Sequence, residues 1–78
     1  MTLRIISPSK ILFSGEIHLV KVPGTSGSFA VLKNHASLTS TLEKGQIKVI
    51  TDKGEEKYFE CSRGFIEVKD NKVSILVD

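Results

Sequence analysis

The segment QIKVITDKGEEKYFEC, residues 46–61, decides the fold class. Gln46 to Ile50 alternates polar and apolar side chains, which is the period of a strand with one buried face. Thr51 to Glu55 supplies the aspartate and glycine that are typical of a hairpin loop, and Lys57 to Cys61 returns as a second strand. The segment therefore predicts a β-hairpin.

Other short apolar segments lie on both sides of this hairpin, and glycine, proline, serine or asparagine bounds them. No apolar period of 3.6 residues is sustained, so we expect no helix longer than about one turn. Val20 breaks the alternation of Glu16 to Val22, which is compatible with a β-bulge. The pattern predicts about eight to ten short strands, at the spacing typical of a β-sandwich or barrel. Strands are expected at residues 3–6, 11–13, 16–22, 38–42, 46–50, 57–61, 65–68 and 73–77.

The segment from Pro23 to Leu38, PGTSGSFAVLKNHASL, is the one long stretch without a regular strand pattern. Its glycines and serines are typical of turns, and Phe29, Val31 and Leu32 then form a short apolar island. A disordered segment has no reason to gather such residues, and long loops in compact domains are often functional. We therefore expect an ordered loop that docks its apolar side chains and presents its polar ones.

Composition limits the classes of protein to which the chain can belong. Its 78 residues form one domain, 1–78, with a core so small that we expect a partner to add to its stability. The net charge of +2 is too weak and too mixed for nucleic-acid binding. The single cysteine, Cys61, excludes an internal disulfide. No apolar run approaches the roughly 18 residues of a membrane span, and no secretory signal begins the chain.

Residues that could perform catalysis do not form a recognisable group. His18 lies on the polar face of an expected strand, and His35 lies in the loop, without a nucleophile and carboxylate at a recognisable spacing. Glu55 and Glu56 flank a hairpin and are expected to be solvated. No metal-ligand cluster and no phosphate-binding loop is present. We predict a protein that is not an enzyme and that uses no metal or cofactor.

Two binding functions remain as alternatives. A lipoyl-type carrier domain carries its modified lysine at a hairpin tip, and Lys53 has that position, although lysine is common at such tips and the turn itself requires Gly54. An oligonucleotide-binding domain stacks bases on exposed aromatic side chains. The four Phe residues and one Tyr lie mostly at inward phases of strands, which favours a role in the core.

Several collinear motifs resemble the epsilon subunit of F-type ATP synthases, over essentially the whole chain. The opening motifs match, and the central stretch resembles the family's segment around a conserved Gly-His-Ala. A Leu-x-x-Gly motif, a Ser-x-Gly-Phe motif and a closing Asn-x-Val motif follow in the same order. The matching residues are Ile6–Pro8, Leu12–Glu16, Val20–Gly24, Leu32–Leu38, Leu42–Val49, Ser62–Val68 and Asn71–Asp78.

The resemblance implies a ten-stranded β-sandwich of two five-stranded sheets. It implies a non-catalytic rotor subunit of the central stalk, which couples proton translocation to ATP synthesis. The subunit would lie peripherally at the cytoplasmic face of the bacterial plasma membrane, bound to the gamma subunit and the c-ring. By position, Ser28 corresponds to a c-ring contact. The corresponding gamma contacts are Ser7, His35, Ser40 and Ser62, and we expect the three serines to surround His35 in one patch with little charge.

The chain departs from the family pattern at several places. Lys33-Asn34 replaces a Pro-Gly pair, Ser37 replaces a proline, Arg63 replaces a glycine, and Ser28 replaces a common acidic residue. The family's C-terminal helical hairpin is absent from the 78 residues. At this length, we expect a subunit that couples without inhibiting ATP hydrolysis, since a hairpin needs some two dozen further residues.

Overall fold

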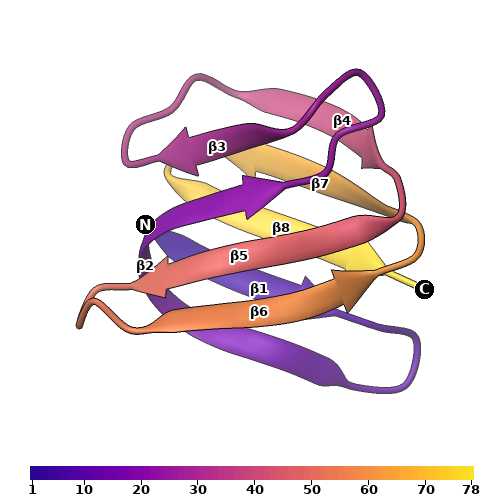
Figure 1. Cartoon of the computed structure of the whole chain (residues 1–78). Coiled ribbons are helices and arrows are strands. Elements are labelled where there is room, and N and C mark those ends of the chain that lie inside the picture. Colours follow the sequence, from indigo (N-terminus) through magenta and orange to yellow (C-terminus); the bar gives the residue numbers. More distant parts are fainter.

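A computed structural model describes residues 1–78, and its eight strands form one continuous, curled sheet (Figure 1). The strand order is β4-β7-β8-β1-β2-β5-β6, and β3 pairs with β2 beside this path. No helix that could cross a membrane is present. The strands are β1 (Thr2–Ile6), β2 (Ile11–Val22), β3 (Phe29–Leu32), β4 (Leu38–Leu42), β5 (Gly45–Thr51), β6 (Glu56–Cys61), β7 (Gly64–Lys69) and β8 (Lys72–Val77).

The long strand β2 joins two layers that face each other. Its first half pairs with β1, and its second half pairs with both β3 and β5. The register of β2 with β5 shifts between Ile17 and Leu19, which confirms the bulge suggested by the position of Val20. The β8 layer comprises β4, β7, β8, β1 and the first half of β2. The β5 layer comprises β3, the second half of β2, β5 and β6 (Figure 1).

The all-β class is confirmed, but the structure has eight strands in one sheet rather than ten strands in two five-stranded sheets. Two expected strands, at residues 11–13 and 16–22, are one strand, because Ser14 and Gly15 pair with β1 without a break. The apolar part of the central stretch forms an additional strand, β3, which the sequence pattern did not predict. The β8 layer alone has the expected five strands.

The core lies between the layers and consists of sixteen buried residues. Strand β8 shows the alternation that produces it: Val73, Ile75 and Val77 are buried, whereas the residues between them are exposed. No buried side-chain nitrogen or oxygen lacks a hydrogen-bond partner. Cys61 is also part of this core, and burial raises the pKa of its thiol, with the charge of Asp78 adding to the shift.

The central stretch is ordered and docks on the core as predicted. Val31 is fully buried, and Phe29 packs against the core from its edge. The turn before β3 is fastened to β4, since the backbone N–H of Thr25 donates to the Thr41 carbonyl at 3.1 Å. The hydroxyls of the same two threonines lie 2.8 Å apart. The exposed residues of this stretch are therefore presented by a fixed backbone.

Candidate interaction surface

An apolar row crosses the solvent face of the β8 layer. Ile6 pairs with Ile11 on one side and with Leu76 on the other, and Leu76 pairs with Phe65. Directly paired residues share a face of a sheet. Ile75, the neighbour of Leu76 on β8, is fully buried, so Leu76 and the row point outward. Ile11, Leu76 and Phe65 are 54%, 51% and 40% exposed.

Part of this row lines a groove of about 570 Å³ at one end of the layer. An ion pair lies beside it, where Nε of Arg63 is 3.1 Å from Oδ2 of Asp78. Gly64 has no room for a side chain, because a Cβ there would collide with the Leu76 carbonyl. We call this region the groove end. Its lining residues are Ile6, Ser7, Pro8, Arg63, Gly64, Phe65, Leu76, Val77 and Asp78.

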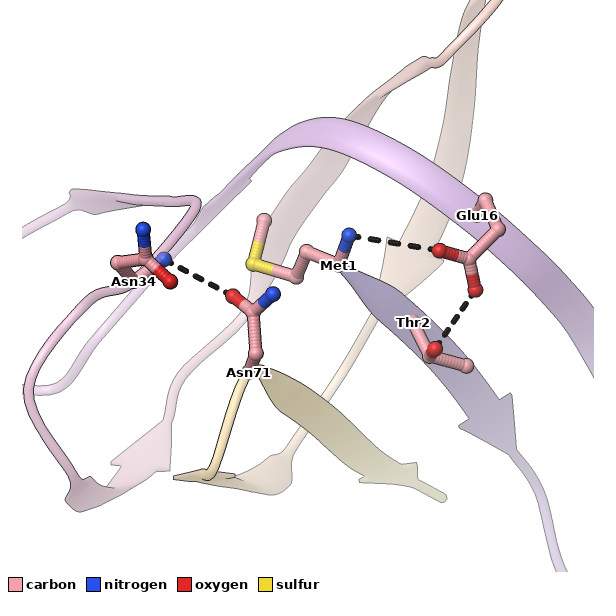
Figure 2. A network of polar contacts seen from close by, with 5 residues as sticks. All are labelled: Met1, Thr2, Glu16, Asn34 and Asn71. Carbon is pink, nitrogen blue, oxygen red and sulfur yellow. Dashed lines mark hydrogen bonds and ion pairs between the residues drawn. The ribbon is translucent and has the colours of Figure 1, made fainter.

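The opposite end of the layer carries a network of polar contacts (Figure 2). The Thr2 hydroxyl donates to Oε2 of Glu16 at 2.6 Å, and the Met1 ammonium lies 3.5 Å from Oε1 of the same carboxylate. The hydrogen bond from Thr2, followed by the charge of the ammonium, lowers the pKa of Glu16 below its ordinary value. Nearby, the backbone N–H of Asn34 donates to Oδ1 of Asn71 at 2.9 Å. We call this region the polar end.

Asn34 belongs to a tight turn that leads to His35. The backbone N–H of His35 donates to the Leu32 carbonyl at 3.1 Å. Asn34 has a φ of 64°, whereas the φ of Lys33 is not positive. A positive φ at the third turn position alone is the pattern of a type II turn, which favours proline followed by glycine. Asparagine tolerates this conformation. The replacement of Pro-Gly by Lys33-Asn34 is therefore compatible with the same turn.

The structure separates the five site residues that the sequence suggested. Ser7 lines the groove, and Ser62 lies in the β6–β7 turn directly before Arg63, so both belong to the groove end. The Ser28 side chain is exposed in the loop before β3. In Figure 1 this loop lies on the same side of the molecule as the chain's C-terminus and the β1–β2 loop.

His35 and Ser40 lie elsewhere. His35 follows Asn34 at the polar end, and along β8 Asn71 of that end and Leu76 of the groove lie about 16 Å apart by the rise of a strand. Ser40 pairs with the buried Ile66, so it shares the inward face of β4 and is half-buried there. The sequence led us to expect the three serines around His35 in one patch. In the structure they do not surround it.

The residues of the apolar row were missed by the reasoning from sequence, although a signal for them exists. In β7 and β8 the inward phase is marked by Ile66, Val73 and Ile75. Phe65 and Leu76 occupy the opposite phase, where a strand of an isolated domain usually carries polar side chains. Large apolar residues at the outward phase of two neighbouring strands indicate a surface that meets a partner.

Other candidate residues have positions consistent with structural roles. Phe13 and Phe59 pack edge to face, with ring centroids 5.9 Å apart, and both contact the core. The His18 side chain is exposed at the β-bulge, as its place on a polar strand face predicted. Lys53 is exposed at the β5–β6 hairpin tip, where Gly54 has a φ of 84°. No group of three or more histidine, cysteine, aspartate or glutamate residues could hold a metal ion.

The sequence profile of one family, described as the beta-sandwich domain of the ATP synthase delta/epsilon chain, matches residues 1–78. The chain belongs to this family. The ATP synthase epsilon chain of Leptospira borgpetersenii is 48% identical over 79 residues, which cover 100% of this chain and 61% of that relative. The epsilon chain of Chlorobaculum tepidum is 42% identical over 77 residues, which cover 99% of this chain and 88% of that relative.

Solved structures of ATP synthases contain chains with the same fold. A chain in the Euglena gracilis mitochondrial ATP synthase superposes with a TM-score of 0.89 at 22% identity, over 96% of this chain and 48% of that one. A chain in the Tetrahymena thermophila mitochondrial ATP synthase, solved as central stalk and c-ring, gives 0.80 at 20% identity, over 99% and 62%. The chain spans about 60% of the length of the Leptospira relatives.

Proposed function

We propose that this chain is a non-catalytic rotor subunit in the central stalk of an F-type ATP synthase. It would link the gamma subunit to the c-ring and so couple proton translocation to ATP synthesis. Membership of the delta/epsilon family supports this function, as do relatives that are named ATP synthase epsilon chains. The observation on which the proposal depends is the apolar row on the solvent face of the β8 layer, since a free-standing domain gains nothing from it.

The gamma subunit is the proposed partner of the groove end. Interfaces have an apolar centre depleted in charge and a polar rim, and the groove has this composition. Ile6, Phe65 and Leu76 supply the apolar centre, while Ser7 and the Arg63 side chain lie at its border. A bound apolar side chain of gamma would displace water from these carbons, which gains roughly 25 cal/mol per Å² of buried apolar surface.

The same interface would extend along β4 to the loop that carries His35. A stable interface buries about 800 Å² on each partner, so residues about 16 Å apart can belong to one contact. Ser62 would take part at the groove end, His35 at the polar end, and Ser40 from the edge strand between them. Because Ser40 shares the inward face of β4, its contact would be made by the strand edge rather than by the sheet face.

Ser28 is the proposed contact with the c-ring. It is exposed in the loop between β2 and β3, whose backbone is fastened to β4. A serine offers a small hydroxyl that can donate and accept hydrogen bonds but provides no charge pairing with a basic loop. The complex would then place this chain peripherally at the cytoplasmic face of the bacterial plasma membrane, without insertion of the chain itself.

Co-purification from cell membranes tests this function. A tagged chain should retain the gamma subunit, and the Leu76→Ser variant should retain less of it. Recovery of no ATP synthase subunit would overturn the proposal. Intact-mass spectrometry of the same sample tests the carrier alternative, because a lipoyl or biotinyl increment on Lys53 would show that function instead.

A further inference from the structure

We infer that Asn71 is a positioning residue, whose side-chain oxygen holds the turn that presents His35 to the gamma subunit. The inference rests on the proposed function, because His35 is a proposed gamma contact. The two residues belong to different loops, since His35 follows β3 whereas Asn71 precedes β8. Their connection is the hydrogen bond from the Asn34 backbone N–H to Oδ1 of Asn71, at 2.9 Å (Figure 2).

Asn71 is itself held rigidly. It is the second residue of a two-residue hairpin loop between β7 and β8, in which Asp70 has a φ of 51° and Asn71 a φ of 63°. Positive φ at both positions is the type I′ turn that matches the twist of the flanking strands. The Asn71 carbonyl also accepts a hydrogen bond from the Thr2 N–H at 3.2 Å. The side chain therefore projects from a backbone fixed by three strands.

The loop that donates this hydrogen bond makes few other hydrogen bonds. Within residues 33–37, the turn closes on itself through the His35 N–H and the Leu32 carbonyl. The His35 ring bonds only to its neighbour, with Nδ1 at 2.7 Å from the Ala36 carbonyl. The bond to Asn71 is thus the only hydrogen bond that ties residues 33–37 to a distant part of the chain.

The peptide that donates to Asn71 is the one that defines the turn. In a type II turn, the central peptide between the second and third residues is flipped relative to a type I turn. Here that peptide joins Lys33 to Asn34, and its N–H points to the Asn71 oxygen. Without the Asn71 oxygen, the Asn34 N–H would lose the hydrogen bond that the type II orientation provides. The alternative orientation of this peptide would then be favoured. The direction in which the chain enters His35 would then change.

Three variants separate positioning from general stability. Asn71→Gly keeps the positive φ and removes the oxygen. Asn71→Asp keeps an oxygen acceptor and tolerates the same φ. Asp70→Gly is the matched control, because it changes the other residue of the same turn, whose side chain makes no hydrogen bond. Each variant is compared for hydrogen exchange of the Asn34 amide and for affinity to the gamma subunit of the same organism, by titration calorimetry.

We expect Asn71→Gly to speed exchange of the Asn34 amide and to weaken gamma binding about three- to tenfold, the range for one neutral hydrogen bond. Asn71→Asp should bind gamma like the unchanged chain, and Asp70→Gly should do the same. In a His35→Ala background, Asn71→Gly should weaken binding no further, because Asn71 acts through that loop. Unchanged gamma affinity in Asn71→Gly, or failure of Asn71→Asp to retain binding, would overturn the inference.

The failure of the inference is distinguishable from the failure of the proposed function. If His35→Ala weakens gamma binding and Asn71→Gly does not, the gamma contact stands and the positioning role is wrong. If neither His35→Ala nor Leu76→Ser weakens binding, the proposed gamma surface is wrong, and the inference fails with it.

Discussion

The two ends of the β8 layer differ in whether their exposed groups have partners within the chain. At the polar end, the Glu16 carboxylate, the Asn34 backbone N–H and the Asn71 side-chain oxygen have partners within the chain. At the groove end, Phe65 and Leu76 remain half in water with no side chain covering them. The difference shows that the polar end is held together by contacts within the chain, and so can present His35 in a fixed position, whereas the apolar surface of the groove end is left for a partner to cover.

Among the predictions that test this difference, we expect the largest effect from a substitution of Gly64, because the groove end has no room for a side chain at this position. In Gly64→Ala, the new Cβ would collide with the Leu76 carbonyl, and backbone atoms cannot give way cheaply. We expect a loss of about 1–3 kcal/mol in the free energy of unfolding, which is typical of overpacking. Denaturant titration measures it.

Gly15→Ala is the control for this prediction. A Cβ at Gly15 would meet only the Phe13 ring at 3.5 Å, which is ordinary contact, and its backbone φ is not positive. The unfolding free energy should change by less than about 1 kcal/mol. Equal losses in the two variants would mean that any glycine substitution in this sheet is costly and that the close approach at the groove end has no special effect.

A smaller effect, on binding rather than folding, separates the groove end from the β5 layer. Leu76 and Tyr58 are both 51% exposed, but Tyr58 lies on β6, where its hydroxyl donates to Glu56 at 2.7 Å. Leu76→Ser should weaken gamma binding by about 1–2 kcal/mol through lost apolar burial, whereas Tyr58→Ser should leave it unchanged. Both isolated variants should stay folded. Equal affinities in a calorimetric titration would show that the apolar row faces solvent.

The smallest expected effect concerns the acid stability of the polar end. The pKa of Glu16 is lowered from its ordinary value of 4.5, so its ionised form stabilises the fold above that pH. This stabilisation is lost as the pH falls below 4.5 through the lowered native pKa. The stability difference between the unchanged chain and Glu16→Gln should therefore shrink with acidification. In a Thr2→Val background, which lacks the hydroxyl that lowers the pKa of Glu16, this difference should change less with pH, and equal curves in the two backgrounds would contradict the role of the Thr2 contact.

Local pattern predicted the fold class because most strands here reveal their buried face by alternation. The bulge in β2 was visible for the same reason, since Val20 breaks the phase of its strand. The continuity of β2 was not visible, because Ser14-Gly15 has turn composition and only pairing with β1 keeps it extended. Strand β3 was hidden because its four residues show no alternation, and its pairing with β2 determines its conformation.

The candidate surface was harder to predict than the fold. The aromatic residues were expected to lie mostly at inward phases of strands, but Phe65 is 40% exposed because its phase opposes that of the buried Ile66. The groove end joins residues 6–8, 63–65 and 76–78, which only the pairing of β1, β7 and β8 brings together. The bond between Asn34 and Asn71 likewise joins residues 37 positions apart. Contacts of this kind depend on topology, which no local pattern contains.

Hydrogen exchange of the chain alone and in complex with the gamma subunit tests the central claim most directly. If the groove end is the surface that gamma completes, amides in residues 6–11, 63–65 and 76–78 should exchange more slowly in the complex. Amides of the β5–β6 hairpin tip, at residues 52–55, should exchange at the same rate in both samples. Protection confined to that hairpin, with unchanged exchange at the groove end, would contradict the account.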